Sequence, residues 1–121
     1  MSRPHERLDA WRESMRLVKL VYAATQSFPK VEMFGLTAQM RRCAVSIPSN
    51  IAEGSARASR RELAQFLNVA KGPLSELETQ MLIAADLGYL NEKDDIFQLA
   101  DRVARLLTGF HRKATGSVAA K

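Results

Sequence analysis

Residues 35–54 read GLTAQMRRCAVSIPSNIAEG and are the most informative part of this 121-residue chain. Apolar side chains recur at steps of three or four residues, which predicts a helix from about Leu36 to Glu53, with Gly54 as its C-cap. The apolar stripe consists of Leu36, Met40, Cys43, Ile47 and Ile51. Pro48 lies inside the helix, where it removes one backbone hydrogen bond and predicts a kink.

A polar line follows the same predicted helix. It consists of Gln39, Ser46, Asn50 and Glu53. Serine and asparagine side chains can bond the carbonyls that a proline frees, so one interpretation makes this line, with Pro48, a structural feature of the kink or of a helix or subunit interface. The alternative is a polar binding pocket. We favour the structural interpretation.

Three further segments show helical spacing of apolar residues. The first runs from about residue 8 to 28 and stops at Pro29, and its stripe is Leu8, Trp11, Met15, Val18, Tyr22, Thr25 and Phe28. The next begins at the capping-box pair Ser59 and Glu62 and ends at Gly88. The last has the stripe Ile96, Leu99, Val103, Leu106 and Phe110.

The pair Gly72-Pro73 interrupts the third segment, which is therefore either one kinked helix or two helices. One kinked helix is favoured, because the apolar stripe keeps its phase across the proline. With connections of about four to seven residues, neighbouring helices are expected to be antiparallel. The predicted fold class is all-α: an up-down-up-down four-helix bundle with proline-kinked helices. A single domain is expected over residues 1–121, with its core at about 8–113 and flexible tails at 1–6 and 115–121.

Charge is strongly segregated along the chain, although its formal net value is only +5. Residues 72–101 hold seven acidic and one basic side chain, whereas residues 102–121 hold five basic and no acidic ones. An antiparallel bundle places the starts of the first and third helices beside the ends of the second and fourth. The sequence therefore predicts a basic pole there and an acidic pole at the opposite end.

Basic side chains on these helices are the candidate nucleic-acid-binding residues, because positive surfaces attract phosphate backbones with little sequence preference. The candidates are Arg12, Arg16, Lys19, Arg57, Arg60, Arg61, Arg102, Arg105 and Arg112. Arg60 and Arg61 are the strongest, since a helix dipole does not favour cations in the first turn. The alternative is an ordinary solvated, charged exterior.

Catalytic and metal-binding signals are weak. His5 and His111 have no evident third ligand and are interpreted as surface residues, and Cys43 as an inert core residue. We therefore predict no metal, no cofactor, no catalytic residues and no enzymatic activity. A lone cysteine, the absence of a leader-like apolar segment and the absence of a run of about 20 apolar residues predict a soluble, cytoplasmic protein.

The stretch GLTAQMRRCAVSIPSNIAEGSARASRRELAQFLNVAKGPLSELETQ resembles the signature of a bacterial four-helix-bundle family, and its core, SIPSNIAEG, is highly specific. Trp11, Phe28-Pro29 and Leu87-Gly88-Tyr89 extend the resemblance to roughly residues 8–110. Members include proteins encoded in intervening sequences of large-subunit ribosomal RNA genes and accessory variability determinants of diversity-generating retroelements. Cys43 and Pro73 depart from the expected pattern, where alanine and serine are usual.

The resemblance implies a parallel, ring-shaped homopentamer around a central channel. For the retroelement members it further implies nucleic-acid binding through a basic surface and association with a reverse transcriptase. Two hypotheses follow for this chain. One is a nucleic-acid-binding accessory protein acting on RNA or DNA, and the other is a homo-oligomeric scaffold whose main partner is another protein, such as a reverse transcriptase.

Overall fold

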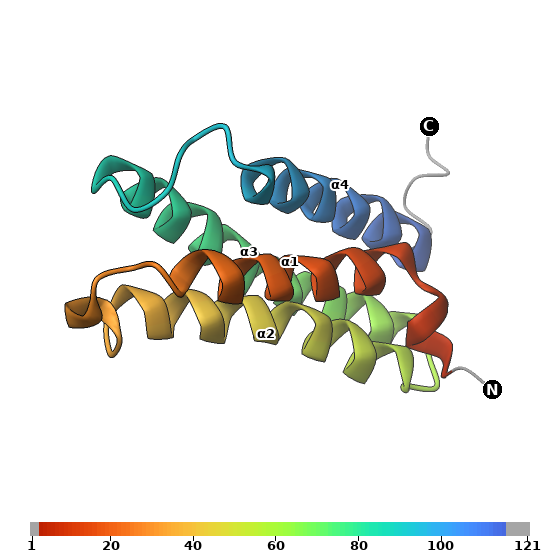
Figure 1. Ribbon diagram of the computed structural model, residues 1–121. Helices are drawn as coiled ribbons and strands as arrows, with labels where there is room; N and C mark the ends of the chain where they lie inside the picture. The colour runs from red at the N-terminus through yellow and green to blue at the C-terminus, as the bar shows by residue number, and fades with distance from the viewer. Residues whose placement is uncertain (1–2, 116–121) are drawn as a thin grey trace.

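The computed structural model describes residues 3–115, which form four long helices and two short 3-10 helices and contain no strand. In chain order these are η1 (Pro4–Arg7), α1 (Asp9–Thr25), η2 (Lys30–Glu32), α2 (Leu36–Ser55), α3 (Arg60–Asp86) and α4 (Asp95–Thr115). Successive helices run in opposite directions (Figure 1), and α4 closes the bundle by packing against both α3 and α1. The predicted all-α, four-helix architecture is confirmed.

Part of the N-terminal segment has regular secondary structure that the sequence did not predict. Residues 4–6, assigned to a flexible tail, lie in η1, which contacts α1 and α2. The Arg12 guanidinium donates to the Glu6 carbonyl at 2.9 Å, and the Glu6 carboxylate accepts from the Arg3 backbone N–H at 3.1 Å. These bonds hold η1 against the start of α1. The predicted C-terminal tail lies outside the described residues except for Thr115, which ends α4.

Both internal prolines lie within continuous helices. Helix α2 continues through Pro48, and α3 continues through Pro73, so the alternative of two separate helices is wrong. Gly72 precedes Pro73 and lacks the Cβ that would press on the proline ring in a helical conformation. Near Pro48, Asn50 Nδ2 donates to the Ser46 carbonyl at 2.8 Å and Ser49 Oγ to the Val45 carbonyl at 2.8 Å. Side chains that follow the proline thus bond carbonyls in the turn that precedes it.

Gly54 is not the C-cap that the sequence predicted. Helix α2 extends to Ser55, and Gly54 is buried inside its last turn. A Cβ at this position would lie 2.7 Å from Phe66 Cβ and 3.3 Å from Leu63 Cδ1 on α3. The glycine is therefore needed for the close approach of α2 and α3 rather than for a left-handed turn. Gly88 has the predicted terminating role, with φ of 84° directly after α3.

The core differs from the predicted stripes mainly in α1. Its buried side chains are Ala10, Ser14, Leu17, Val21 and Thr25, one position away from most of the predicted set. Two polar residues are accommodated because Ser14 Oγ donates to the Trp11 carbonyl and Thr25 Oγ1 to the Val21 carbonyl, each at 2.8 Å. Tyr22 is left at the surface, where the Arg41 guanidinium lies 4.6 Å from its ring centroid. Small side chains thus allow α1 to pack close to its neighbours.

Candidate nucleic-acid interface

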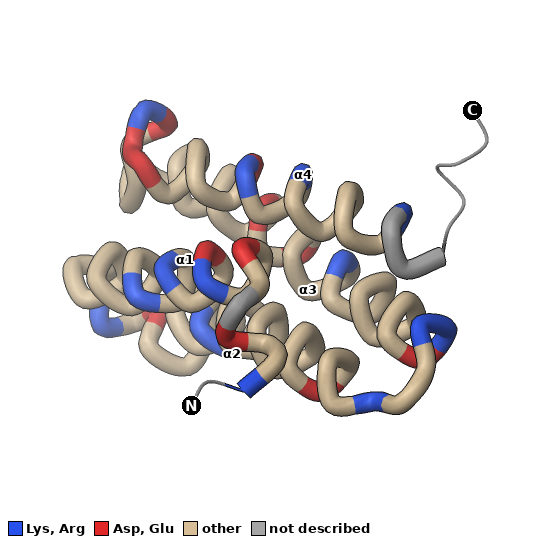
Figure 2. The backbone as a smooth tube through the Cα atoms, turned by 90° about the vertical axis from the view of Figure 1, so that its right-hand side faces the viewer, with Lys and Arg blue, Asp and Glu red and all other residues tan. Residues whose placement is uncertain are grey.

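Four helix ends meet at one pole of the bundle: the starts of α1 and α3 and the ends of α2 and α4 (Figure 1). Blue Lys and Arg positions gather at the α2–α3 connection and at the end of α4 when the molecule is viewed from this side (Figure 2). The predicted residues at this basic pole are Arg12, Arg57, Arg60, Arg61 and Arg112. Arg16, Lys19, Arg102 and Arg105 lie further along α1 and α4.

Glu13 on α1 pairs with two of the predicted arginines, of which Arg16 lies on the same helix and Arg102 links α1 to α4. Arg16 Nη1 lies 2.6 Å from Glu13 Oε1, and Arg102 Nε lies 2.9 Å from Glu13 Oε2. Hydrogen bonds from Arg102 and then Arg16 hold the pKa of the Glu13 carboxyl below its ordinary value. Both arginines thus have a structural role as partners of an ionised carboxylate, which reduces the positive potential that they offer to a phosphate.

Three other predicted arginines also pair with acidic residues three or four positions away in the sequence. Arg12 pairs with Asp9, and Arg105 Nη2 lies 3.3 Å from Asp101 Oδ2. Arg57 Nη2 lies 3.2 Å from Glu53 Oε2, and its guanidinium stacks 4.8 Å from the centroid of the Phe66 ring. Glu53, which the sequence analysis grouped with the proline kink or an interface, therefore pairs with Arg57 at the surface of the basic pole.

Arg60 and Arg61 differ from these arginines in their surroundings. Both are exposed in the first turn of α3, and neither forms an ion pair within residues 3–115. The preceding residue, Ser59, caps the helix by accepting from the Glu62 backbone N–H at 3.1 Å. Because this cap does not involve the arginines and the helix dipole disfavours them, their positive charges are available to an external anion.

A shallow groove of about 390 Å³ opens between α1 and α4 beside the basic pole. Leu8, Leu106 and Phe110 provide its apolar lining, and Arg105 lies at its edge. Aromatic rings and guanidinium groups are surfaces on which unpaired nucleobases stack. The groove therefore presents an aromatic ring and a guanidinium group beside the basic pole.

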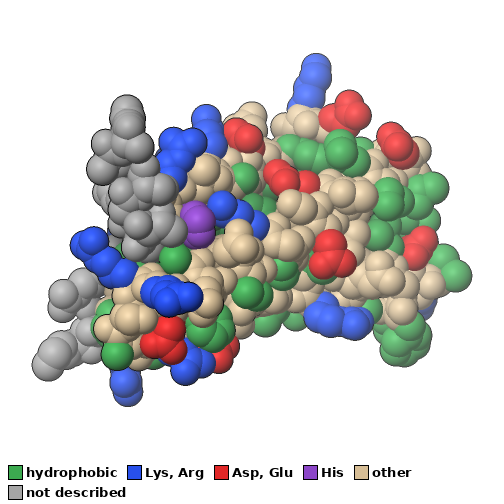
Figure 3. Space-filling model, turned by 180° about the vertical axis from the view of Figure 1, so that it is seen from behind, with side chains coloured by type: hydrophobic (Ala, Val, Ile, Leu, Met, Phe, Trp, Pro, Cys, Tyr) green, Lys and Arg blue, Asp and Glu red, His purple; other side chains and the backbone are tan. Residues whose placement is uncertain are grey.

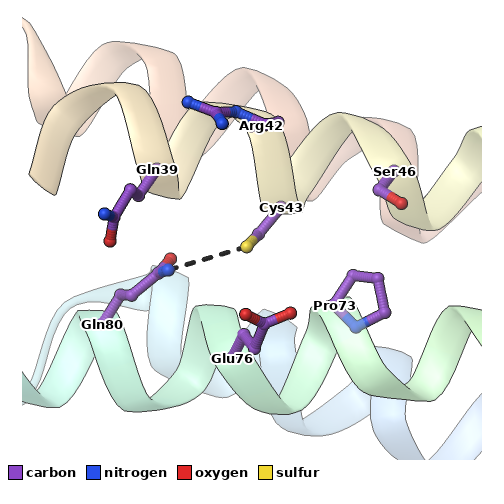
Figure 4. Close-up of a pocket in the computed structure, with 7 residues that line it drawn as sticks. All are labelled: Gln39, Arg42, Cys43, Ser46, Pro73, Glu76 and Gln80. Carbon is purple, nitrogen blue, oxygen red and sulfur yellow. Dashed lines mark hydrogen bonds between the residues drawn. The ribbon is translucent and has the colours of Figure 1, made fainter. Parts of the chain in front are cut away.

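A second groove, of about 400 Å³, separates α2 from α3 and contains part of the predicted polar line (Figure 4). Gln39 and Ser46 line it from α2, and Glu76 and Gln80 from α3. Gln80 Nε2 donates to Cys43 Sγ at 3.6 Å, whereas Gln80 Oε1 is buried and has no hydrogen-bond partner among the described residues. The sequence analysis did not include Glu76 and Gln80 in this groove. Helical spacing shows which residues share a face of one helix, but it does not show which neighbouring helix that face contacts.

Cys43 faces this groove and is half-buried, so it lies at the margin of the core, against which it packs, and not at its centre. Burial raises the pKa of the Cys43 thiol, which is therefore protonated near neutral pH and a poor nucleophile.

His5 packs against Trp11, with ring centroids 5.0 Å apart. Within residues 3–115, no three histidine, cysteine or carboxylate side chains come together as metal ligands would.

The fold and its surfaces define a four-helix-bundle protein with one strongly basic end. Residues 6–109 match the family model of the 23S rRNA-intervening sequence protein, and the chain belongs to this family. No curated protein matches the chain. The family resemblance inferred from the SIPSNIAEG stretch is confirmed. Among the described helices, none is both long and apolar enough to span a membrane.

Proposed function

We propose that this protein is a non-catalytic, cytoplasmic accessory factor that binds RNA or DNA through its basic pole. The observation that carries the proposal is the exposed pair Arg60–Arg61, which has no carboxylate partner within the described residues. Phosphate oxygens are the natural partners of unpaired guanidinium groups. Such contacts carry no base information, so binding is sequence-tolerant and falls steeply with added salt.

The chain assembles, in this proposal, into a ring of five copies that repeats the basic pole around a common axis. The α2–α3 groove supports assembly, since the exposed carboxylate of Glu76 lines it and forms no ion pair among the described residues. A neighbouring copy can supply a cation for it. Repetition of Arg60 and Arg61 around a ring raises the local concentration of cations and strengthens a weak single-subunit interaction.

The test of nucleic-acid binding is fluorescence anisotropy with a labelled single-stranded RNA over a salt series. We expect Arg60→Glu with Arg61→Glu to weaken binding at least about tenfold and to lower the salt slope by about 0.7 for each lost phosphate contact. The matched control is Lys30→Glu with Lys93→Glu at the other pole, which changes the net charge by the same amount and should retain most of the affinity. If RNA does not bind at low salt, or if both double variants bind equally, a homo-oligomeric scaffold for a protein partner replaces this proposal.

Assembly is tested by sedimentation equilibrium at micromolar concentration. For a five-copy ring, the measured molar mass should be five times the 13.5 kDa of one chain. Ser46→Arg should shift the population towards the monomer, because Ser46 lines the α2–α3 groove, whereas exposed Ser49 lies outside it. Ser49→Arg is therefore the control, and helix content by circular dichroism verifies that both variants fold. A monomeric parent protein, or a ring unaffected by Ser46→Arg, would contradict this use of the groove.

A further inference from the structure

The end of the molecule opposite the basic pole exposes an unusual number of large apolar side chains. They are Val31, Met33 and Phe34, in and after η2, and Leu82, Ile83 and Leu87, at the end of α3. Val31 and Phe34 are 84% and 93% exposed. The rear view shows green apolar surface at this end, with red carboxylates between its parts (Figure 3). Soluble proteins seldom gather such residues without a binding role.

Two connections that are far apart in sequence are joined at this end. The Tyr89 hydroxyl donates to Glu32 Oε2 at 3.1 Å, and the Tyr89 and Phe28 ring centroids lie 5.2 Å apart. These contacts fasten the segment after α3 to the segment between α1 and α2. The exposed apolar residues of both segments therefore belong to one end surface, which we call the apolar–acidic end. Its apolar residues are Val31, Met33, Phe34, Leu82, Ile83 and Leu87.

Carboxylates surround the apolar residues without cationic partners. The acidic side chains are Glu32, Asp86, Glu92, Asp94 and Asp95, against two lysines, Lys30 and Lys93. None of the five carboxylates forms an ion pair in the part of the chain that the structure describes. Glu32 and Asp94 accept local hydrogen bonds, from Tyr89 and from the Asn91 backbone N–H respectively. The surface thus combines an apolar contact area with net negative charge.

We propose that the apolar–acidic end docks a basic, amphipathic helical segment of a partner protein. Apolar side chains of that segment cover residues such as Phe34 and Leu87, and its lysines or arginines face the unpaired carboxylates. Nucleic acid and anionic membranes are repelled by the same carboxylates. A second copy's basic pole fits poorly, because none of the exposed large apolar residues of the described chain lies there. The proposal is independent of nucleic-acid binding, which uses the other pole.

The experiment measures binding of a fluorescein-labelled, designed leucine–lysine amphipathic peptide of about 18 residues to the full chain at physiological salt. Phe34→Ser with Leu87→Ser should raise the Kd at least about tenfold, since both side chains are exposed and belong to the proposed contact. Asp86→Asn with Glu92→Gln should weaken binding and reduce its salt dependence. The matched control is Val45→Ser with Val69→Ser, which removes two exposed apolar side chains elsewhere and should leave the Kd unchanged.

Four outcomes would overturn the proposal. Equal affinity of the Phe34→Ser, Leu87→Ser variant would place the peptide elsewhere, and equal binding of a scrambled peptide would show that only charge matters. Self-association of the chain that disappears in this variant would make a second copy the occupant. Co-sedimentation with neutral phosphatidylcholine vesicles that depends on Phe34 would assign the surface to lipid. Circular dichroism of each variant confirms that the fold is intact, as expected for exposed positions.

Discussion

Gly54→Val should lower the free energy of unfolding by about 3 kcal/mol, because valine over-packs the contact between α2 and α3. Even the first added carbon would lie 2.7 Å from Phe66 Cβ. That atom is attached directly to the α3 backbone, so it cannot move aside as the end of a flexible side chain can. The helices must separate locally, and the stacking of Arg57 on Phe66 is disturbed as well.

Urea unfolding followed by circular dichroism measures this effect, and Gly109→Ala provides the control. Gly109 also lies within a helix, but nothing lies within 4 Å of the Cβ that alanine would add there. Alanine at this position should therefore raise stability by about 0.5–1 kcal/mol, since it has the higher helix propensity. If Gly54→Val were as stable as the parent protein, the close approach of α2 and α3 would be wrong.

The architecture was predictable because helical periodicity, prolines and capping residues are local features. The pair Ser59 and Glu62 located the start of α3 to within one residue, and Gly88 located its end. The role of Gly54 was not predictable, because a glycine serves equally well as a C-cap or as a point of close helix contact. Only the position of Phe66 on the facing helix distinguishes the two.

The rotation of a helix about its axis was harder to predict than its length. Helix α1 is apolar over a broad arc, and the larger residues of that arc, including Tyr22, suggested the core stripe. The bundle instead buries the smaller Ala10 and Ser14, because helix spacing limits what fits between helices.

The ion-pair partners of the arginines were also hard to predict from the sequence. The basic pole followed from charge order and antiparallel topology, but the partnership of Arg102 with Glu13 depends on a residue 89 positions away. The sequence singled out Arg60 and Arg61 by their place in the first turn of a helix, but it could not show that Arg102 is held by a distant carboxylate.

Ile47→Ala should lower the free energy of unfolding by about 3 kcal/mol, whereas Val45→Ala, two residues earlier in the same helix, should change it by less than about 0.5 kcal/mol. Ile47 belongs to the SIPSNIAEG stretch and Val45 directly precedes it. Both side chains are β-branched and apolar. Ile47 is fully buried among the four helices, and Val45 is 42% exposed. The difference arises because truncating Ile47 leaves a cavity next to Pro48, in a part of α2 where the proline restricts backbone relaxation.

Urea unfolding of the two variants tests the rotation of α2 about its axis directly. The comparison requires that the free energy of unfolding depends on urea concentration with the same slope in both variants. A large decrease in the free energy of unfolding for Val45→Ala would show that this side chain is in contact with other residues, either within the bundle or in a neighbouring copy. Repeating the melts at several protein concentrations separates these two cases, since only a contact between copies makes the loss depend on concentration. The expected result, a large and concentration-independent effect at Ile47 with almost none at Val45, requires α2 to present the Ile47 side to the core and the Val45 side to solvent.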